Sequence, residues 1–173
     1  MKIESPAFTL DDVHAFMDGY LDRERKLLAG RLDAVSHRLA ELAPRVTKER
    51  SDDESWTAHE LLAHIAVLSK YYGVLVHRVA SGQMDDLEIM QAVNARDAAG
   101  DRMAELEPEH LLEMALNDQR RTAEELRTAD VAALRRSARL DGEHSMTAEE
   151  IARLPLVSHL ETHIEQLETL LGG

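Results

Sequence analysis

The sequence predicts an all-α protein, a four-helix bundle with long connections between its second and third helices and between its third and fourth. Three features support this fold. Apolar residues recur at spacings of three and four through four long segments, as on the buried face of an amphipathic helix. Thr and Pro stand where helices begin, and no segment has the alternation of a convincing strand. Since 173 residues can form one compact core, we expect a single domain, 1–173.

The first predicted helix runs from Leu10 to about Leu42 and is ended by Pro44. At 1.5 Å per residue, a helix of roughly 30 residues is about 45 Å long. Gly19 and Gly30 are expected to weaken it locally, because glycine has a low helix propensity.

The second helix follows a polar linker and begins at Thr57, which forms a capping box with Glu60. It ends near Ser81–Gly82. The next stretch, Met84–Gly100, is less regular and favours one short helix before Gly100.

The third helix is predicted at Pro108–Thr128, with proline at its first position. Gln119 and Thr122 fall on its inward stripe. This pattern indicates either a helix that is less buried than the others or the polar wall of a pocket.

The fourth helix follows a segment, Ala129–Ser145, that is expected to be irregular with a turn at Asp141–Gly142. A second capping box begins this helix at Thr147, and the helix reaches Leu171. Pro155 inside it predicts a kink, because proline removes a backbone hydrogen bond.

Charge and composition restrict the function. The chain has 20 Lys and Arg against 33 Asp and Glu, a net charge of −13, which argues against nucleic acid and anionic membranes as partners. Without an apolar run of membrane length or a signal-peptide pattern, the expected compartment is the cytoplasm. There is no cysteine, which excludes disulfides, thiolate metal ligands and a cysteine nucleophile. The 16 arginines against 4 lysines suggest a GC-rich bacterial source.

Three histidines are candidate metal ligands. His159 and His163 are four residues apart and therefore share one helix face. His64 lies among apolar residues of the second helix. Taken alone, a histidine pair at this spacing often has no metal-binding role, and a histidine among apolar residues is often only hydrogen-bonded to a neighbour. Together, three imidazoles from two helices match a catalytic metal site with an open position.

Two other metal motifs do not fit. His59 and His64 resemble the zinc-protease pair HExxH, but their spacing of five residues places them roughly 140° apart on a helix. A di-iron site needs two Glu-x-x-His pairs, and only Glu107 with His110 has this spacing.

Two segments resemble the DinB-like (YfiT-like) superfamily, which includes mycothiol-dependent maleylpyruvate isomerases and bacillithiol S-transferases. The segment WTAHELLAHIA, residues 56–66, is similar to its W-[ST]-x-x-[DE]-L-[LV]-x-H-[LI] motif, and HLETHIEQL, residues 159–167, to its closing H-x-x-x-H-x-x-Q-[LI]. The resemblance implies a divalent metal, most often zinc or nickel, held by His64, His159 and His163. It implies that Gln166 is a hydrogen-bond partner supporting a metal-binding histidine.

The expected activity is that of a thiol S-transferase or isomerase. Three neutral ligands leave the ion its +2 charge, which holds an external low-molecular-weight thiol as thiolate for attack on an electrophilic substrate. Mycothiol and bacillithiol are the candidate thiols, because the chain has no cysteine of its own. The alternatives are a metal-dependent hydrolase and a non-catalytic, dimeric binding or stress-response module with a structural or absent metal.

Further candidates lie outside the triad. Arg136 and Arg139, with Arg135, are candidates to hold carboxylates of a thiol cofactor, against the alternative of a solvated basic turn. Asn94 resembles an asparagine of some DinB-like relatives, with helix capping or pocket lining as its roles. Tyr71 and Tyr72 are expected to pack. A homodimer through the first helix is also expected.

Overall fold

The computed structural model describes residues 9–49, 55–87, 89–140 and 144–172. α1 (Leu10–Leu42) begins at Thr9, whose hydroxyl accepts from the backbone N–H of Asp12, while the Asp12 carboxylate accepts from the N–H of Thr9. The helix is continuous through both of its glycines and ends where predicted. The 3₁₀ helix η1 (Ala43–Arg45) follows it.

α2 (Ala58–Ala80) and α4 (Pro108–Thr128) also confirm the predicted helix starts. Thr57 and Glu60 form the capping box of α2 in both directions. Pro108 occupies the first turn of α4, where its missing N–H has no helical partner to lose.

The C-terminal helical segment begins at Thr147, which forms the predicted capping box with Glu150. It comprises α6 (Ala148–Ile151), the π-helical η2 (Ala152–Ser158) and α7 (His159–Leu170). Pro155, where the sequence predicts a kink, lies inside this π-helical stretch, whose hydrogen-bond pattern differs from that of the α-helices on either side.

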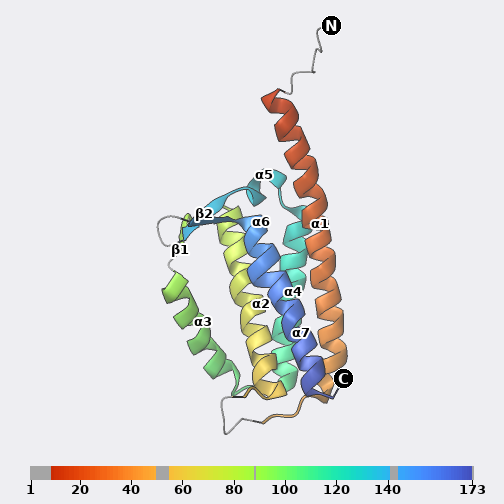
Figure 1. Ribbon diagram of the computed structural model, residues 1–173. Coiled ribbons are helices and arrows are strands. Elements are labelled where there is room, and N and C mark those ends of the chain that lie inside the picture. Colours follow the sequence, from red (N-terminus) through yellow and green to blue (C-terminus); the bar gives the residue numbers. More distant parts are fainter. Residues whose placement is uncertain (1–8, 50–54, 88, 141–143, 173) are drawn as a thin grey trace.

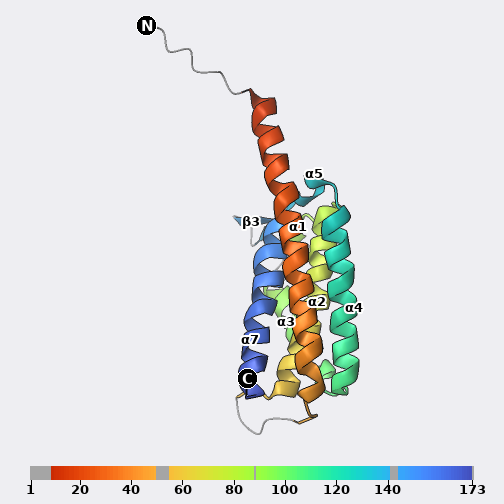
Figure 2. The ribbon, with the colours of Figure 1, turned by 90° about the vertical axis from the view of Figure 1, so that its right-hand side faces the viewer.

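The long helices lie side by side (Figures 1 and 2). α1 and α2 pack against α4, and α7 packs against α2 and α1. The core between them consists of fully buried aliphatic side chains, among them Leu28, Leu32, Leu39, Leu62, Ile65, Leu68, Leu111, Leu126 and Leu160. The structure is mostly helical, as the all-α prediction requires.

The first turns of α1 project beyond the other helices (Figure 1). Leu10, Val13, Phe16, Met17 and Tyr20 are exposed there, and the buried face of α1 starts only at Leu21. Within the described residues, no helix combines the length and the apolar character that crossing a membrane requires.

The connections contain strands that the sequence analysis did not predict. β1 (Asp86–Leu87) and α3 (Ile89–Met103) lie between α2 and α4, while α5 (Val131–Leu134), β2 (Ser137–Leu140) and β3 (His144–Thr147) lie between α4 and α6. The sheet order is β1-β2-β3, with β1 and β2 parallel and β2 and β3 antiparallel.

The expectation that 129–145 is irregular was therefore wrong for the described part of that segment. Strands of two and four residues are too short to show a period of two, and Asp86 pairs with the distant Arg139. The predicted turn at Asp141–Gly142 lies outside the described residues. α3 lies a few residues later than the short helix predicted at Met84–Gly100.

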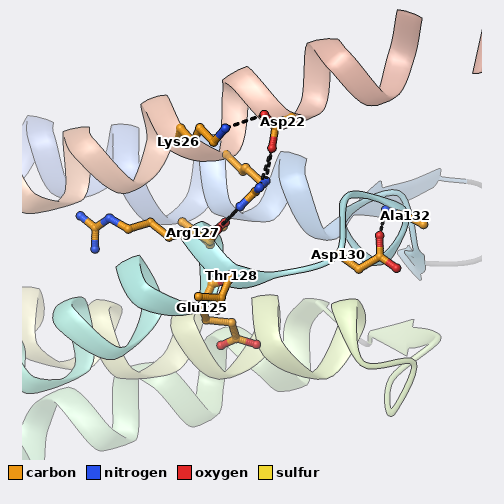
Figure 3. Close-up of polar contacts among 9 residues, drawn as sticks. Asp22, Lys26, Glu125, Arg127, Thr128, Asp130 and Ala132 are labelled. Atoms are coloured by element: carbon orange, nitrogen blue, oxygen red, sulfur yellow. Dashed lines mark hydrogen bonds and ion pairs between the residues drawn. The ribbon is translucent and has the colours of Figure 1, made fainter. Parts of the chain in front are cut away.

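The C-terminal end of α4 is fixed to α1. Arg25 donates a hydrogen bond of 3.2 Å to the carbonyl of Leu126 and a second one to the carbonyl of Arg127. Figure 3 shows this junction, with Lys26 beside Asp22 on α1 at 2.6 Å. The free carbonyls at a helix end thereby gain a cationic donor.

The two polar residues on the inward stripe of α4 are themselves buried, although α4 buries a smaller share of its residues than α2. Gln119 is 1% exposed and Thr122 is 2% exposed. The Gln119 amide donates to Ser69 Oγ of α2 at 2.9 Å, and Ser36 Oγ of α1 donates to its carbonyl oxygen at 2.6 Å. A hydrogen-bonded network among three helices therefore accounts for Gln119, and the Thr122 hydroxyl donates to the carbonyl of Asp118 within α4 at 3.0 Å.

Candidate metal centre

Histidines from α2 and α7 meet in one cluster. His64 lies in the second turn of α2, and His159 and His163 occupy successive turns of α7. One ring nitrogen of each histidine lies within 4.8 Å of one ring nitrogen of each of the other two. Among the described residues, these three histidines form the group that could hold a metal ion. The ring centroids of His64 and His163 are 4.8 Å apart, and those of His159 and His163 are 4.5 Å apart.

His163 is the most buried member of the cluster, with 8% of its surface exposed. Its Nδ1 lies 2.7 Å from Oε1 of Gln166, one turn further along α7. An amide oxygen accepts only, so Nδ1 carries the proton and Nε2 keeps its lone pair.

The Nε2 atom of His163 is buried and has no hydrogen-bond partner in the described part of the chain. A buried nitrogen without a partner costs free energy. A cation shared with the neighbouring imidazoles of His64 and His159 would satisfy this lone pair, so the donor set fits a metal that prefers nitrogen ligands.

The environment keeps two of these histidines neutral. Burial lowers the pKa of His159, and the neighbouring His163 and the positive charge of Arg96 add to the lowering. Burial also lowers the pKa of His163. The hydrogen bond to Gln166 raises this pKa, and the positive charge of Arg96 lowers it further. Neutral imidazole is the form that binds a metal, so these pKa directions favour metal binding near neutral pH.

Trp56 covers one side of the cluster. Its ring meets that of His64 edge to face at 4.6 Å and lies nearly parallel to that of His163 at 6.0 Å. The indole is 47% exposed and forms one wall of an open groove of about 700 Å³. His163, Leu61, Gln166 and Leu170 also line this groove, whose surface is mainly apolar.

Tyr72 and Arg96 lie on the side of His159. The ring of Tyr72 is 6.4 Å from that of His159, and Nη1 of Arg96 lies 3.5 Å from the Tyr72 hydroxyl. Arg96 is half-buried on α3, which packs on α2 (Figure 1). Sequence reasoning missed this arginine, because it belongs to an irregular stretch whose position depends on tertiary packing.

The other predicted site residues do not join the cluster. Arg136 donates to the carbonyl of Ala80 at the far end of α2, sixteen residues or roughly 24 Å along the helix from His64. Arg139 pairs with Asp86 at 2.9 Å in the small sheet. Asn94 is exposed on α3.

His59 also lies outside the cluster, as its spacing predicts. It is completely buried, with Nε2 2.9 Å from the carbonyl oxygen of Leu106 and Nδ1 3.3 Å from that of Glu49. Its ring links the start of α2 to Glu49, which precedes this helix in the sequence, and to Leu106, which follows it. This is a structural role.

No protein-family model and no curated protein matches this sequence. Among solved structures, the fold is similar to the crystal structure of the mycothiol-dependent maleylpyruvate isomerase, with a TM-score of 0.66 and 19% sequence identity. The similarity covers 84% of this chain, and the chain spans 60% of that structure. The two sequence motifs resemble a group that includes such isomerases, so this resemblance is confirmed at the level of the fold. At this identity the likeness extends to the fold alone.

Proposed function

We propose that this chain is a DinB-like four-helix-bundle domain, 1–173, that acts as a divalent-metal-dependent S-transferase or isomerase using a low-molecular-weight thiol. The observation that carries the proposal is the cluster of His64, His159 and His163, whose ring nitrogens lie within 4.8 Å of one another. The buried Nε2 of His163, which has no hydrogen-bond partner among the residues that the structure describes, supports it independently of any resemblance.

The three histidines hold the metal, with zinc or nickel as the expected ion. Gln166 accepts the Nδ1 proton of His163, which fixes the tautomer that presents Nε2. When bound, the ion supplies a +2 charge that lowers the pKa of a thiol beside it. Trp56 shields the cluster from water on one side and leaves the groove beside it for an apolar ligand.

The thiol is a cosubstrate from outside the chain, because the sequence has no cysteine. Mycothiol is the first candidate and bacillithiol the second, since the structurally similar isomerase is mycothiol-dependent. We also propose a bacterial, cytoplasmic protein whose partners are the thiol and an electrophilic small molecule, without nucleic acid or membrane.

Elemental analysis of protein purified without an affinity tag tests the metal site. About one divalent ion per chain is expected, and His64→Ala, His159→Ala and His163→Ala should each lose it. His37→Ala is the matched control, because His37 is exposed and is not a member of the cluster. Protein that contains no metal and takes up neither zinc nor nickel contradicts the proposal.

Thiol conjugation tests the activity. Metal-loaded protein is incubated with monochlorobimane and, in turn, mycothiol, bacillithiol, glutathione or cysteine. We expect acceleration with mycothiol or bacillithiol that disappears in His163→Ala. Turnover without any thiol would instead indicate a hydrolase, and no acceleration with any thiol would reject the transferase.

One observation favours a second candidate, a non-catalytic dimeric binding module. The projecting part of α1 exposes Leu10, Val13, Met17 and Tyr20 at spacings of three and four, a pattern suited to pairing with the same helix of a second copy. Light scattering of the wild type and Val13→Glu/Met17→Glu tests it. A dimer that dissociates in the double variant, together with absent thiol chemistry, supports the module.

A further inference from the structure

Ion pairs join α1 to the C-terminal helical segment at regular intervals along their contact (Figure 2). The three pairs are Glu24 with Arg153, Arg31 with Glu161, and Arg38 with Glu168. Along α1 the paired residues are seven apart, which is about two turns of an α-helix. Along the C-terminal segment their partners are first eight and then seven residues apart. Between its first two pairs, this segment therefore contains one residue more than an α-helix would need.

The additional residue is absorbed in the π-helical η2, which lies between Arg153 and Glu161. A π-helical hydrogen bond spans five residues instead of four, so each turn takes up more of the chain. In a continuous α-helix, each residue of α7 would occupy the position of its successor, turned by about 100°. Thr162 would then face His64 in place of His163. The rotation of α7 about its own axis thus decides whether its histidines meet the one on α2.

The central ion pair holds the part of α7 that carries the histidines. Glu161 lies between His159 and His163 in the sequence, and its two carboxylate oxygens accept from Nε and Nη2 of Arg31, the first at 2.8 Å. Nη2 of Arg31 also donates to Oγ of Ser158 at 3.1 Å. A guanidinium bound through two parallel hydrogen bonds fixes orientation as well as distance. One side chain of α1 thereby fixes both ends of the first turn of α7.

The exposure of this pair indicates an effect on orientation more than on stability. The side chains of Arg31 and Glu161 are 29% and 36% exposed, and ion pairs that are open to water add little to the free energy of unfolding. A metal site, in contrast, needs its ligand atoms within about 0.5 Å of the productive geometry. A small rotation of α7 therefore affects metal binding more than it affects folding.

We propose that Arg31 is a positioning residue for the histidine cluster: with Glu161 and Ser158 it fixes the rotation of α7 at which the two histidines of this helix face His64. Arg31 acts through the helix and is not a ligand. This inference rests on the metal site of the proposed function, but not on the use of a thiol.

Zinc affinity tests the role of Arg31. Arg31→Met should weaken zinc binding about tenfold, as the loss of a group that orients ligands does. Removing a positive charge by itself favours a cation, so a weaker affinity cannot come from the change in charge. Competition with a chromophoric chelator measures the affinity, and far-UV circular dichroism confirms that each variant is folded.

Arg38→Met is the matched control, because Arg38 pairs with Glu168 between the same two helices, seven residues further along each. It should leave zinc affinity within about twofold of the wild type, since an exposed ion pair contributes little by itself. The midpoint of urea denaturation of the metal-free protein should change by similar amounts in Arg31→Met and Arg38→Met. A merely structural role of Arg31 would make zinc affinity follow this midpoint.

Reversal of the pair gives a second measurement. Arg31→Glu should weaken zinc binding, and Arg31→Glu/Glu161→Arg should recover most of the loss because the two helices are joined again. Arg31→Lys keeps the charge but not the two parallel hydrogen bonds, so its affinity should lie between those of the wild type and Arg31→Met.

The outcomes separate the two proposals. An unchanged affinity in Arg31→Met, or an equal loss in Arg38→Met, overturns the role of Arg31. A wild type that binds no zinc rejects the metal site and this inference together. Zinc binding that depends on Arg31, without any thiol conjugation, keeps the inference and rejects the proposed function. Thiol conjugation by the wild type, with equal zinc affinity in Arg31→Met, keeps the function and rejects the inference.

Discussion

Oε1 of Gln166 lies 2.7 Å from Nδ1 of His163, one helical turn away on α7. This contact decides which ring nitrogen of the most buried histidine carries a proton. It leaves Nε2, which is buried and unpartnered within the described chain, as the atom that would bind a metal. The orientation of this ring therefore depends on a single amide side chain.

Gln166→Leu should weaken zinc binding about 10- to 100-fold, because His163 loses the acceptor that orients its ring. Competition with a chromophoric chelator measures the affinity. Gln166→Glu keeps an acceptor and should bind zinc at least as tightly as the wild type. Glu165→Gln, an exposed neighbour on the same helix, is the control, and equal affinity of all three variants would exclude a role for the contact.

Metal-free protein should lose stability as the pH falls below about 6.5. The pKa values of His159 and His163 are lowered from 6.5 in the folded state, chiefly by burial, so the unfolded chain binds more protons below that pH. Their contribution is fully present above pH 6.5 and is lost as the pH falls through the folded pKa values. Urea denaturation between pH 5 and 8 measures it. His159→Gln/His163→Gln should flatten the profile, and an unchanged slope would refute this origin.

His59→Ala should reduce the free energy of unfolding by about 1–3 kcal/mol, because the completely buried imidazole and its hydrogen bond with the carbonyl of Leu106 are lost. The metal content should nevertheless remain about one ion per chain, since His59 lies outside the cluster. Denaturant titration and elemental analysis measure the two quantities. Loss of the metal in a folded His59→Ala variant would show that this histidine is also a ligand.

Gly73→Ala should destabilise the protein by about 1–3 kcal/mol. A Cβ atom at Gly73 would lie 2.5 Å from Thr122 Oγ1, so either the Thr122 side chain would have to rotate and lose its hydrogen bond to Asp118 or α2 and α4 would have to separate. Gly30→Ala is the matched control: no atom lies within 4 Å of its Cβ, and alanine there should stabilise α1 by up to about 1 kcal/mol. Adding Thr122→Ala to Gly73→Ala should make room for the new methyl group, and thermal unfolding of the double variant tests this.

Much of the helical framework is encoded locally. The capping boxes at Thr57 and Thr147 and the proline at the start of α4 mark helix starts through contacts within three residues, so they are readable in the sequence. The spacing of His159 and His163 is similarly local. Their meeting with His64 was inferred from a resemblance of motifs, because no local rule relates α2 to α7.

The features that the sequence did not reveal depend on long-range contacts. The strand pairing joins Asp86 to Arg139, which is distant in the chain. The burial of Gln119 and the contact of Arg96 with Tyr72 depend on how the helices dock. Arg136 and Arg139 were plausible ligands for an anion by residue type alone, yet their carbonyl and carboxylate partners hold them at the other end of α2.

The sequence by itself determined where the long helices start and that any reactive thiol must come from outside a chain without cysteine. Only the tertiary structure decided that three imidazoles meet within 4.8 Å, that Gln166 orients one of them, and that an arginine of α3 lies beside them. The physical reason is that caps and periodicity are properties of a few neighbouring residues, whereas the electrostatics of a site depend on groups that packing brings together.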